Sequence, residues 1–272
     1  MNSSDFSFIQ ITDHHLREHE SDLTFGFSPA HAFRATLRHI ARRSPPPDFI
    51  LTTGDLVHAG TPAEYQTARA MLGLRELSPA PGPQAVTAEG LHDMPMYFLP
   101  GNHDPRAVFF RNMFSDTVEP AAGAPPLMDV EFAHKGMRFI CIDWGGDNKP
   151  VATPAMLSFL ARSLENPAPA ILLMHHARAP VGIPRLDSCL PDDMPAFEAV
   201  VRGSSLLAMF CGHFHTTYQT IVAGIPVYGL RSTTFSFAAD GAQTLYVLRP
   251  PHYRVITVSS STVNTEIVEV AL

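Results

Sequence analysis

Five short clusters of aspartate, asparagine and histidine lie between residues 13 and 215, and each follows a run of apolar residues. Carboxylate oxygens, an amide oxygen and imidazole nitrogens all bind metal ions, and no cluster contains a cysteine. One Asp-x-His or Gly-Asp pair is common by chance, so the joint occurrence of five clusters indicates the metal site. The candidate ligands are Asp13, His15, Asp55, Asn102, His175, His213 and His215.

The spacing within two clusters suggests how their side chains converge. Asp13 and His15 are two residues apart at the end of an apolar run. Because residues two apart in a strand point to the same face, both are expected to reach one ion, while His14 points away. His213 and His215 repeat this spacing.

The other clusters supply single ligands on turns. Gly54 permits a sharp turn that leaves the carboxylate of Asp55 projecting above the sheet, where it can bridge two cations. Residues 100–104 form a tight turn that offers Asn102 as a neutral ligand, and His175 follows a later apolar run.

This mixed set of oxygen and imidazole donors suits Fe, Mn, Zn or Co and argues against calcium, which takes oxygens only. Two divalent or trivalent ions about 3.5 Å apart would clamp the attacking and leaving oxygens of an in-line displacement. They would also lower the pKa of a bridging water and so supply hydroxide at neutral pH. That chemistry is phosphoester hydrolysis.

The elements that position these clusters alternate between strand and helix. Three helical patterns each open with a hydroxyl residue followed by proline, at Ser28-Pro29, Thr61-Pro62 and Thr153-Pro154. The alternation predicts parallel strands joined by right-handed crossovers, with the site at the carboxyl ends of the strands. The predicted strands span residues 6–12, 49–53, 96–99, 139–143, 171–174 and 206–211.

After His215 the pattern changes to short strands without helices, at about 218–223, 244–248, 253–259 and 266–270. We therefore expect antiparallel ends to the sheets, and two sheets packed face to face with helices outside. Residues 1–272 are predicted to form one domain. The Pro- and Gly-rich residues 78–91 are predicted to be a surface loop or flap, and residues 120–126 a second loop.

Composition restricts the partners. The net charge is −7 without a basic run, which argues against polymeric nucleic acid. No basic leader precedes an apolar stretch and no run approaches a membrane span, so a soluble cytoplasmic protein without membrane contact is expected. The three cysteines are too few and too scattered for a disulfide framework.

In this order the clusters resemble the motifs of the calcineurin-like metallophosphoesterase superfamily: D-x-H, G-D, G-N-H-[DE], H and G-H-x-H. The sequence is most similar to bacterial class III cyclic nucleotide phosphodiesterases and related glycerophosphodiesterases. The resemblance implies a four-layer α/β/β/α sandwich, with two mixed sheets flanked by helices. It also implies a homo-oligomer, a dimer or larger.

The resemblance also assigns roles to residues. It implies that Asp13, His15, Asp55 and His215 hold one metal and that Asp55, Asn102, His175 and His213 hold the other. His103 would contact the phosphoryl oxygen and protonate the leaving alkoxide, with Asp104 orienting it.

Four further residues are weighed near these motifs. His176 is expected to support a metal ligand from behind or to line the substrate pocket, since only one histidine of its pair can occupy the ligand position. The relatives continue this pair with Pro-Pro, whereas Arg178 here could reach a substrate phosphate, against the alternative of a surface arginine. For His14 and His58 an exposed position is favoured over a place at the entrance.

The leading hypothesis is a phosphodiesterase for small substrates of the cyclic nucleotide or glycerophosphodiester type. A phosphomonoesterase, or a pyrophosphatase of nucleotide-linked lipid precursors, would use the same metals with a different pocket. A non-catalytic scaffold is disfavoured because all seven ligands and His103 are intact.

Overall fold

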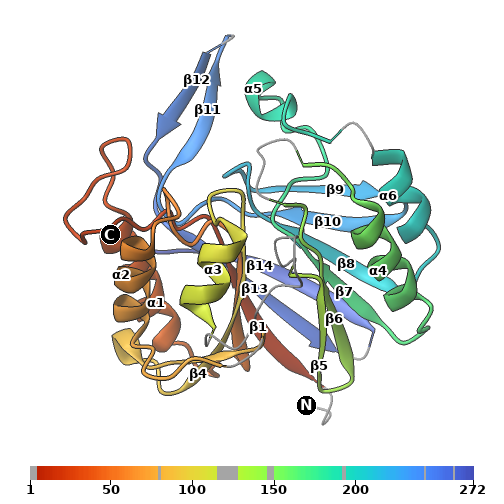
Figure 1. Cartoon of the computed structure of the whole chain (residues 1–272), viewed down its shortest axis with the longest axis horizontal. Helices are drawn as coiled ribbons and strands as arrows, with labels where there is room; N and C mark the ends of the chain where they lie inside the picture. The colour runs from red at the N-terminus through yellow and green to blue at the C-terminus, as the bar shows by residue number, and fades with distance from the viewer. Residues whose placement is uncertain are drawn as a thin grey trace.

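Two six-stranded mixed sheets pack face to face at the centre of the fold (Figure 1). The computed structural model describes residues 5–78, 81–114, 128–145, 150–191, 194–241, 243–259 and 261–272. The loop predicted at residues 120–126 lies outside the described residues.

The first sheet contains the first and the last strands of the fold. Its strands are β1 (Phe6–Ile11), β2 (Phe49–Thr53), β3 (Gln84–Val86), β4 (Met94–Leu99), β13 (His252–Ser259) and β14 (Thr262–Glu269). Their order is β14-β13-β1-β2-β4-β3. The three central strands β1, β2 and β4 are parallel, and the outer strands pair antiparallel, as expected for the late strands.

The second sheet is built from the middle of the chain. Its strands are β5 (Val130–His134), β6 (Met137–Cys141), β7 (Ala170–Leu173), β8 (Leu206–Cys211), β9 (Tyr218–Val222) and β10 (Ile225–Gly229). Their order is β5-β6-β7-β8-β10-β9, with β6, β7, β8 and β10 parallel.

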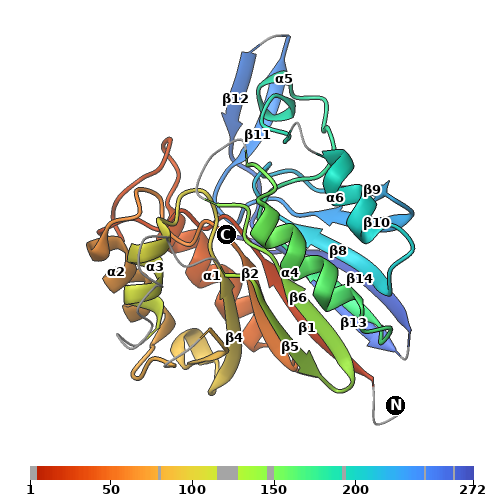
Figure 2. The same cartoon turned by 45° about the vertical axis from the view of Figure 1, so that its right-hand side comes forward.

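Helices cover the outer face of each sheet (Figures 1 and 2). On the first sheet lie α1 (Pro29–Ala41), α2 (Pro62–Leu72) and α3 (Arg106–Met113), and on the second lie α4 (Pro154–Leu164) and α6 (Met194–Val201). The predicted N-caps are confirmed, because the side chains of Ser28, Thr61 and Thr153 each accept a hydrogen bond from a backbone amide of the first turn.

An aromatic core holds the two sheets together. The rings of Phe8 and Phe49 from the first sheet stack with centroids 4.9 Å apart. Phe139 and Phe210 from the second sheet meet Phe8 edge to face at 5.3 and 6.1 Å. With apolar clusters also on both outer faces, the predicted four-layer α/β/β/α sandwich is confirmed.

The segment predicted to be a flap contributes an edge strand instead of a free loop. β3 pairs with β4, and a short 3₁₀ helix, η1 (Ala88–Gly90), follows. The buried amide of Gln84 donates to the carbonyl of Met113 and accepts from the amide of Ser78. None of the described residues in 78–91 lines the active-site cavity.

The strand expected at 244–248 does not extend a main sheet. β12 (Gln243–Val247) pairs only with β11 (Ser236–Asp240), and this hairpin projects from the body of the fold (Figure 1). The reason is that neither strand of the hairpin has a fully buried face. Within the described residues, no helix is long and apolar enough to cross a bilayer.

Candidate active site

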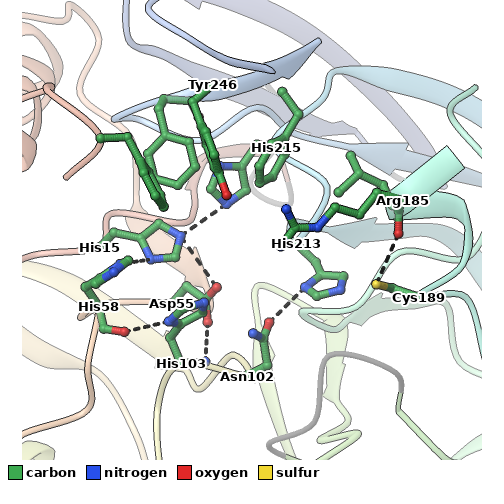
Figure 3. A pocket seen from close by; sticks show the side chains of 14 residues that line it. His15, Asp55, His58, Asn102, His103, Arg185, Cys189, His213, His215 and Tyr246 are labelled. Atoms are coloured by element: carbon green, nitrogen blue, oxygen red, sulfur yellow. Dashed lines mark hydrogen bonds and ion pairs between the residues drawn. The ribbon is translucent and has the colours of Figure 1, made fainter. Parts of the chain in front are cut away.

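The candidate ligands meet where the carboxyl ends of parallel strands from both sheets come together. β1, β2, β4, β7 and β8 each end just before one cluster. A cavity of about 310 Å³ opens there. Figure 3 shows the side chains that line it. One side of it is lined by His15, Asp55, Asn102, His103, His213 and His215.

One group of four ligands is compact and buried. The ligand atoms of Asp13, His15, Asp55 and His215 all lie within 4.8 Å of one another. Nε2 of His215 is 3.2 Å from Oδ1 of Asp13 and 3.1 Å from Nε2 of His15. None of the four is more than 3% exposed. This is the set that the resemblance assigns to one metal.

A second group lies beside the first and shares one carboxylate with it. Oδ1 of Asn102 is 3.0 Å from Nε2 of His175 and 2.8 Å from Nδ1 of His213. Oδ2 of Asp55 is 3.5 Å from Nε2 of His175 and 3.6 Å from Nε2 of His15. One carboxylate oxygen therefore faces both groups.

The convergence depends on left-handed turns of the backbone. Each pair, Asp13 with His15 and His213 with His215, was expected to converge because its members share one face of a strand. That explanation is wrong, because β1 ends at Ile11 and β8 ends at Cys211, before either pair. Non-glycine residues rarely adopt a positive φ, and such strain is concentrated at functional sites. Five ligands adopt it, with φ between 45° and 69°: Asp13, His15, Asp55, His213 and His215.

Backbone contacts fix the orientation of the ligands. The carbonyls of Thr53 and Phe235 lie 2.7 and 3.0 Å from Nδ1 of His175 and His215. When Nδ1 donates there, Nε2 is left to face the other ligands. The amide of His103 donates to Oδ1 of Asp55 at 2.8 Å, which leaves Oδ2 for the shared position.

The charges of the site favour a bound cation. Burial by itself would lower the pKa of His175, but the carboxylates of Asp55 and Asp13 raise it to about 9. Burial opposes the charge of Asp55, yet His175, His15 and His103 hold the pKa of that carboxyl well below its ordinary value. The buried carboxylates thus keep a proton on His175 that metal ions would replace. The oxygen and imidazole donors fit Fe, Mn, Zn or Co.

The profile of the calcineurin-like phosphoesterase family matches residues 6–217. The chain belongs to this family. That match covers the five motifs and confirms the predicted class of enzyme, a metal-dependent phosphoesterase.

Relatives of this phosphoesterase align over most of its length. A glycerophosphodiester phosphodiesterase of Enterobacter lignolyticus is 27% identical over 253 residues, which cover 89% of this chain and 83% of that protein. A cAMP/cGMP dual specificity phosphodiesterase of Mycobacterium tuberculosis is 28% identical over 236 residues, covering 85% and 69%. A 3',5'-cyclic adenosine monophosphate phosphodiesterase of Vibrio vulnificus is 24% identical over 270 residues, covering 96% and 88%.

Solved structures share the fold. The purple acid phosphatase PPD1 of yellow lupin matches with a TM-score of 0.65 at 12% identity. The match covers 97% of this phosphoesterase, which spans about half (51%) of the lupin chain. GAP50, the anchor in the inner membrane complex of Plasmodium, matches with a TM-score of 0.58 at 12% identity, covering 97% and 84%.

The expected contact between Asp104 and the ring of His103 is wrong. The buried carboxylate of Asp104 accepts from the hydroxyl of Tyr65 and from the amides of Leu56 and Gly101. It therefore joins the turns that carry Asp55 and Asn102. The ring of His103 is oriented by the carbonyl of His58, which lies 2.5 Å from its Nδ1.

Substrate contacts were expected for His176 and Arg178, but the structure places both residues outside the cavity lining. Both side chains are buried, at 1% and 3% exposure, and neither lines the cavity. The ring of His176 packs 4.6 Å from that of His213. The guanidinium of Arg178 lies 3.7 Å from the ring centroid of Trp144, so the alternative of a surface arginine is wrong.

Two histidines for which exposure was favoured are placed differently. His14 is fully buried, and its ring nitrogens lie 3.0 and 2.9 Å from the hydroxyls of Thr52 and Thr233. His58 lines the cavity, and its ring stacks on that of His103 at 5.2 Å. In the sequence, the one signal for this placement of His58 was its position four residues after Gly54.

None of the residues in the remaining cavity wall was predicted from the sequence. This wall includes Phe25, Arg185, Cys189, Phe237 and Tyr246. These residues come from a loop after β1, from the short helix α5 (Pro184–Asp187) and its following turn, and from the hairpin β11–β12. No motif marks them.

Gly54 provides a direct test of the close packing. Its φ is 101°, and an added Cβ would lie 2.2 Å from Nδ1 of His175. We expect Gly54→Ala to displace His175, to reduce bound metal and to lower kcat/KM by about 100-fold or more. Metal analysis and steady-state kinetics measure both. Gly136→Ala is the matched control, because Gly136 also has a positive φ but no atom within 4 Å of its Cβ position. Unchanged metal content in Gly54→Ala would contradict the prediction.

The raised pKa of His175 predicts a pH dependence for metal binding. At pH 8 the metal-free site holds a proton on His175, because the pKa of about 9 lies above that pH. Loading the site should release about one proton, and affinity should rise as the pH approaches 9. In the metal-free protein the protonated His175 stabilises the fold below pH 6.5, and that stabilisation is lost as the pH rises through about 9.

Calorimetric titration of the metal-free protein in two buffers of different ionisation enthalpy counts the released protons. Equal heats in both buffers at pH 8 would contradict the prediction.

Proposed function

We propose that this phosphoesterase is a dinuclear metal-dependent phosphodiesterase that hydrolyses small phosphodiesters, of the cyclic nucleotide or glycerophosphodiester type, in the cytoplasm. The observation that carries the proposal is the carboxylate of Asp55, which faces both ligand groups at 3.5 to 3.6 Å. The relatives named as phosphodiesterases support the choice of diesters.

The proposed ligands form two sets around Asp55. One set is Asp13, His15, Asp55 and His215, and the other is Asp55, Asn102, His175 and His213. Bound Fe, Mn, Zn or Co ions would neutralise phosphoryl oxygens and lower the pKa of a water molecule to the neutral range. Five of the seven ligands are buried, and this burial excludes bulk solvent and strengthens their electrostatic interactions: Asp13, His15, Asp55, His175 and His215.

His103 is the proposed proton donor. Its Nδ1 donates to the carbonyl of His58, which fixes the ring and leaves Nε2 for the substrate. The protonated ring can then donate from Nε2 to the oxygen of the leaving alkoxide. His58 is a positioning residue in this scheme, since its carbonyl and its stacked ring hold His103 in place.

We also propose that residues 1–272 act as one catalytic domain. The late strands β13 and β14 belong to the same sheet as β1 and β2, which carry the first two motifs. A homo-oligomer remains a prediction from the resemblance.

A comparison of diester and monoester substrates tests the proposed activity. We expect the Mn-loaded enzyme to hydrolyse bis(p-nitrophenyl) phosphate with a higher kcat/KM than p-nitrophenyl phosphate. Release of p-nitrophenolate measures both. Cleavage of the monoester alone would contradict the proposal and favour a phosphomonoesterase.

Removal of the His103 imidazole tests its role. We expect His103→Asn to lower kcat for a diester with an alkoxide leaving group by about 100-fold or more, with bound metal unchanged. Exposed His92, which lies outside the cavity, gives the control His92→Asn. If His103→Asn keeps the wild-type kcat, His103 is not the proton donor; if it loses metal, its role is in the metal site.

A further inference from the structure

The cavity wall away from the metal ligands is largely aromatic (Figure 3). The ring of Phe235 lies 5.2 Å from that of His15 and 4.5 Å from that of His215. Phe237 of β11 lies 4.8 Å from His215. Tyr246 of β12 continues this surface outward, 5.4 Å from Phe237. An apolar surface of rings inclined by 52° to 85° to one another therefore begins at the candidate ligands and extends toward the cavity entrance.

A tight turn presents one more ring to this surface. Phe25 stacks on Tyr246 with centroids 3.8 Å apart and an interplanar angle of 13°. Its φ is 50°, and the backbones of Thr24 and Phe27 bond to each other in both directions around it. Phe25 is nevertheless 49% exposed. An exposed phenylalanine in a left-handed conformation is unfavourable by itself, which indicates that the ring serves the cavity.

Arg185 adds a permanent positive charge to the same cavity. It lies on α5, and Figure 3 shows its side chain extended from that helix toward the ligand side of the cavity. The carboxylate of Asp187 accepts from the amides of Val181 and Gly182, and Leu186 is buried against Phe214, so α5 is held in place. Across the described ranges no carboxylate forms an ion pair with Arg185.

We propose that the aromatic wall and Arg185 select phosphodiesters in which an esterified alcohol carries a planar aromatic ring, as a nucleoside or an aryl alcohol does. This inference rests on the proposed phosphodiesterase function and deepens it. A base or aryl ring gains stacking energy against Tyr246 and Phe237 while the phosphate reaches the metal side. A guanidinium also stacks on such a ring or donates to its acceptors.

The same wall disfavours the head groups of common glycerophosphodiesters. The ammonium group of choline or ethanolamine would meet the charge of Arg185 without a carboxylate to offset it. The glycerol hydroxyls would exchange water for aromatic faces that offer them few hydrogen-bond partners. The specificity-determining residues are therefore Arg185 and Tyr246, on two elements that carry none of the five motifs.

Matched substrates and variants test the proposal in the Mn-loaded enzyme. We expect kcat/KM for cyclic AMP to exceed that for glycerophosphocholine. Tyr246→Leu should lower kcat/KM for cyclic AMP about tenfold and change that for glycerophosphocholine little. Tyr246→Leu should therefore lower the ratio of kcat/KM for cyclic AMP to kcat/KM for glycerophosphocholine. Arg185→Gln should lower the same ratio by raising kcat/KM for glycerophosphocholine. The controls are Leu245→Ala, which alters the adjacent residue of β12 outside the cavity, and Arg249→Gln, which removes an exposed arginine outside it.

The outcomes separate the two levels of the proposal. If no diester is hydrolysed, the proposed function fails. If diesters are hydrolysed but neither Tyr246→Leu nor Arg185→Gln changes the ratio between the two substrates, the function stands and the specificity inference is overturned.

Thiol labelling of the wild-type holoenzyme gives a readout that does not depend on turnover. Cys189 lines the cavity and is partly exposed, whereas Cys141 and Cys211 are buried. We expect saturating AMP to slow the reaction of Cys189 with a thiol reagent about tenfold, because its base would occupy the aromatic side of the cavity. Glycerol 3-phosphate should protect little. Equal protection by both compounds would overturn the inference.

Discussion

A buried carboxylate shared by two groups of ligands is the constraint around which the structure is arranged. Asp55 is 1% exposed, and its Oδ2 faces His15 and His175, which follow strands β1 and β7 of different sheets. An isolated carboxylate at this depth would be strongly unfavourable, and so would a second one at Asp13. Imidazoles surround both, and that of His175 carries part of the compensating charge, as its raised pKa shows. Cations in the same place would complete the compensation and supply the chemistry.

The backbone provides what this arrangement requires. Left-handed turns at Asp13, Asp55 and His213 aim their side chains inward, and small residues let the turns approach one another. A Cβ at Gly101 would lie 2.1 Å from Oδ1 of Asp55, and one at Gly212 would lie 2.5 Å from Oδ2 of Asp13. Strained turns persist only where the surroundings hold them, and here the aromatic core between the sheets fixes the strand ends from which they start.

The cavity divides into a side fixed by the sheets and a side built on appended elements. The metal side stands on strand ends, where positions are set by sheet register and close packing. The opposite side stands on a projecting hairpin, a turn and a four-residue helix, which the sandwich does not need for its core. Such elements can change residues without disturbing the metal ligands, which is how one fold comes to act on different substrates.

The sequence by itself determined the central strands and which residues cluster as candidate ligands. Strands such as Phe49–Thr53 and Leu206–Cys211 could be predicted to the residue, because continuous β-branched and aromatic runs are a local signal. Only the tertiary structure decided the backbone conformation of Asp13 and His215 and the hydrogen-bond partner of Asp104. It also decided that Arg185, and not Arg178, lines the cavity. Those outcomes depend on which distant side chains meet, and residue spacing along one strand carries no information about the element packed opposite it.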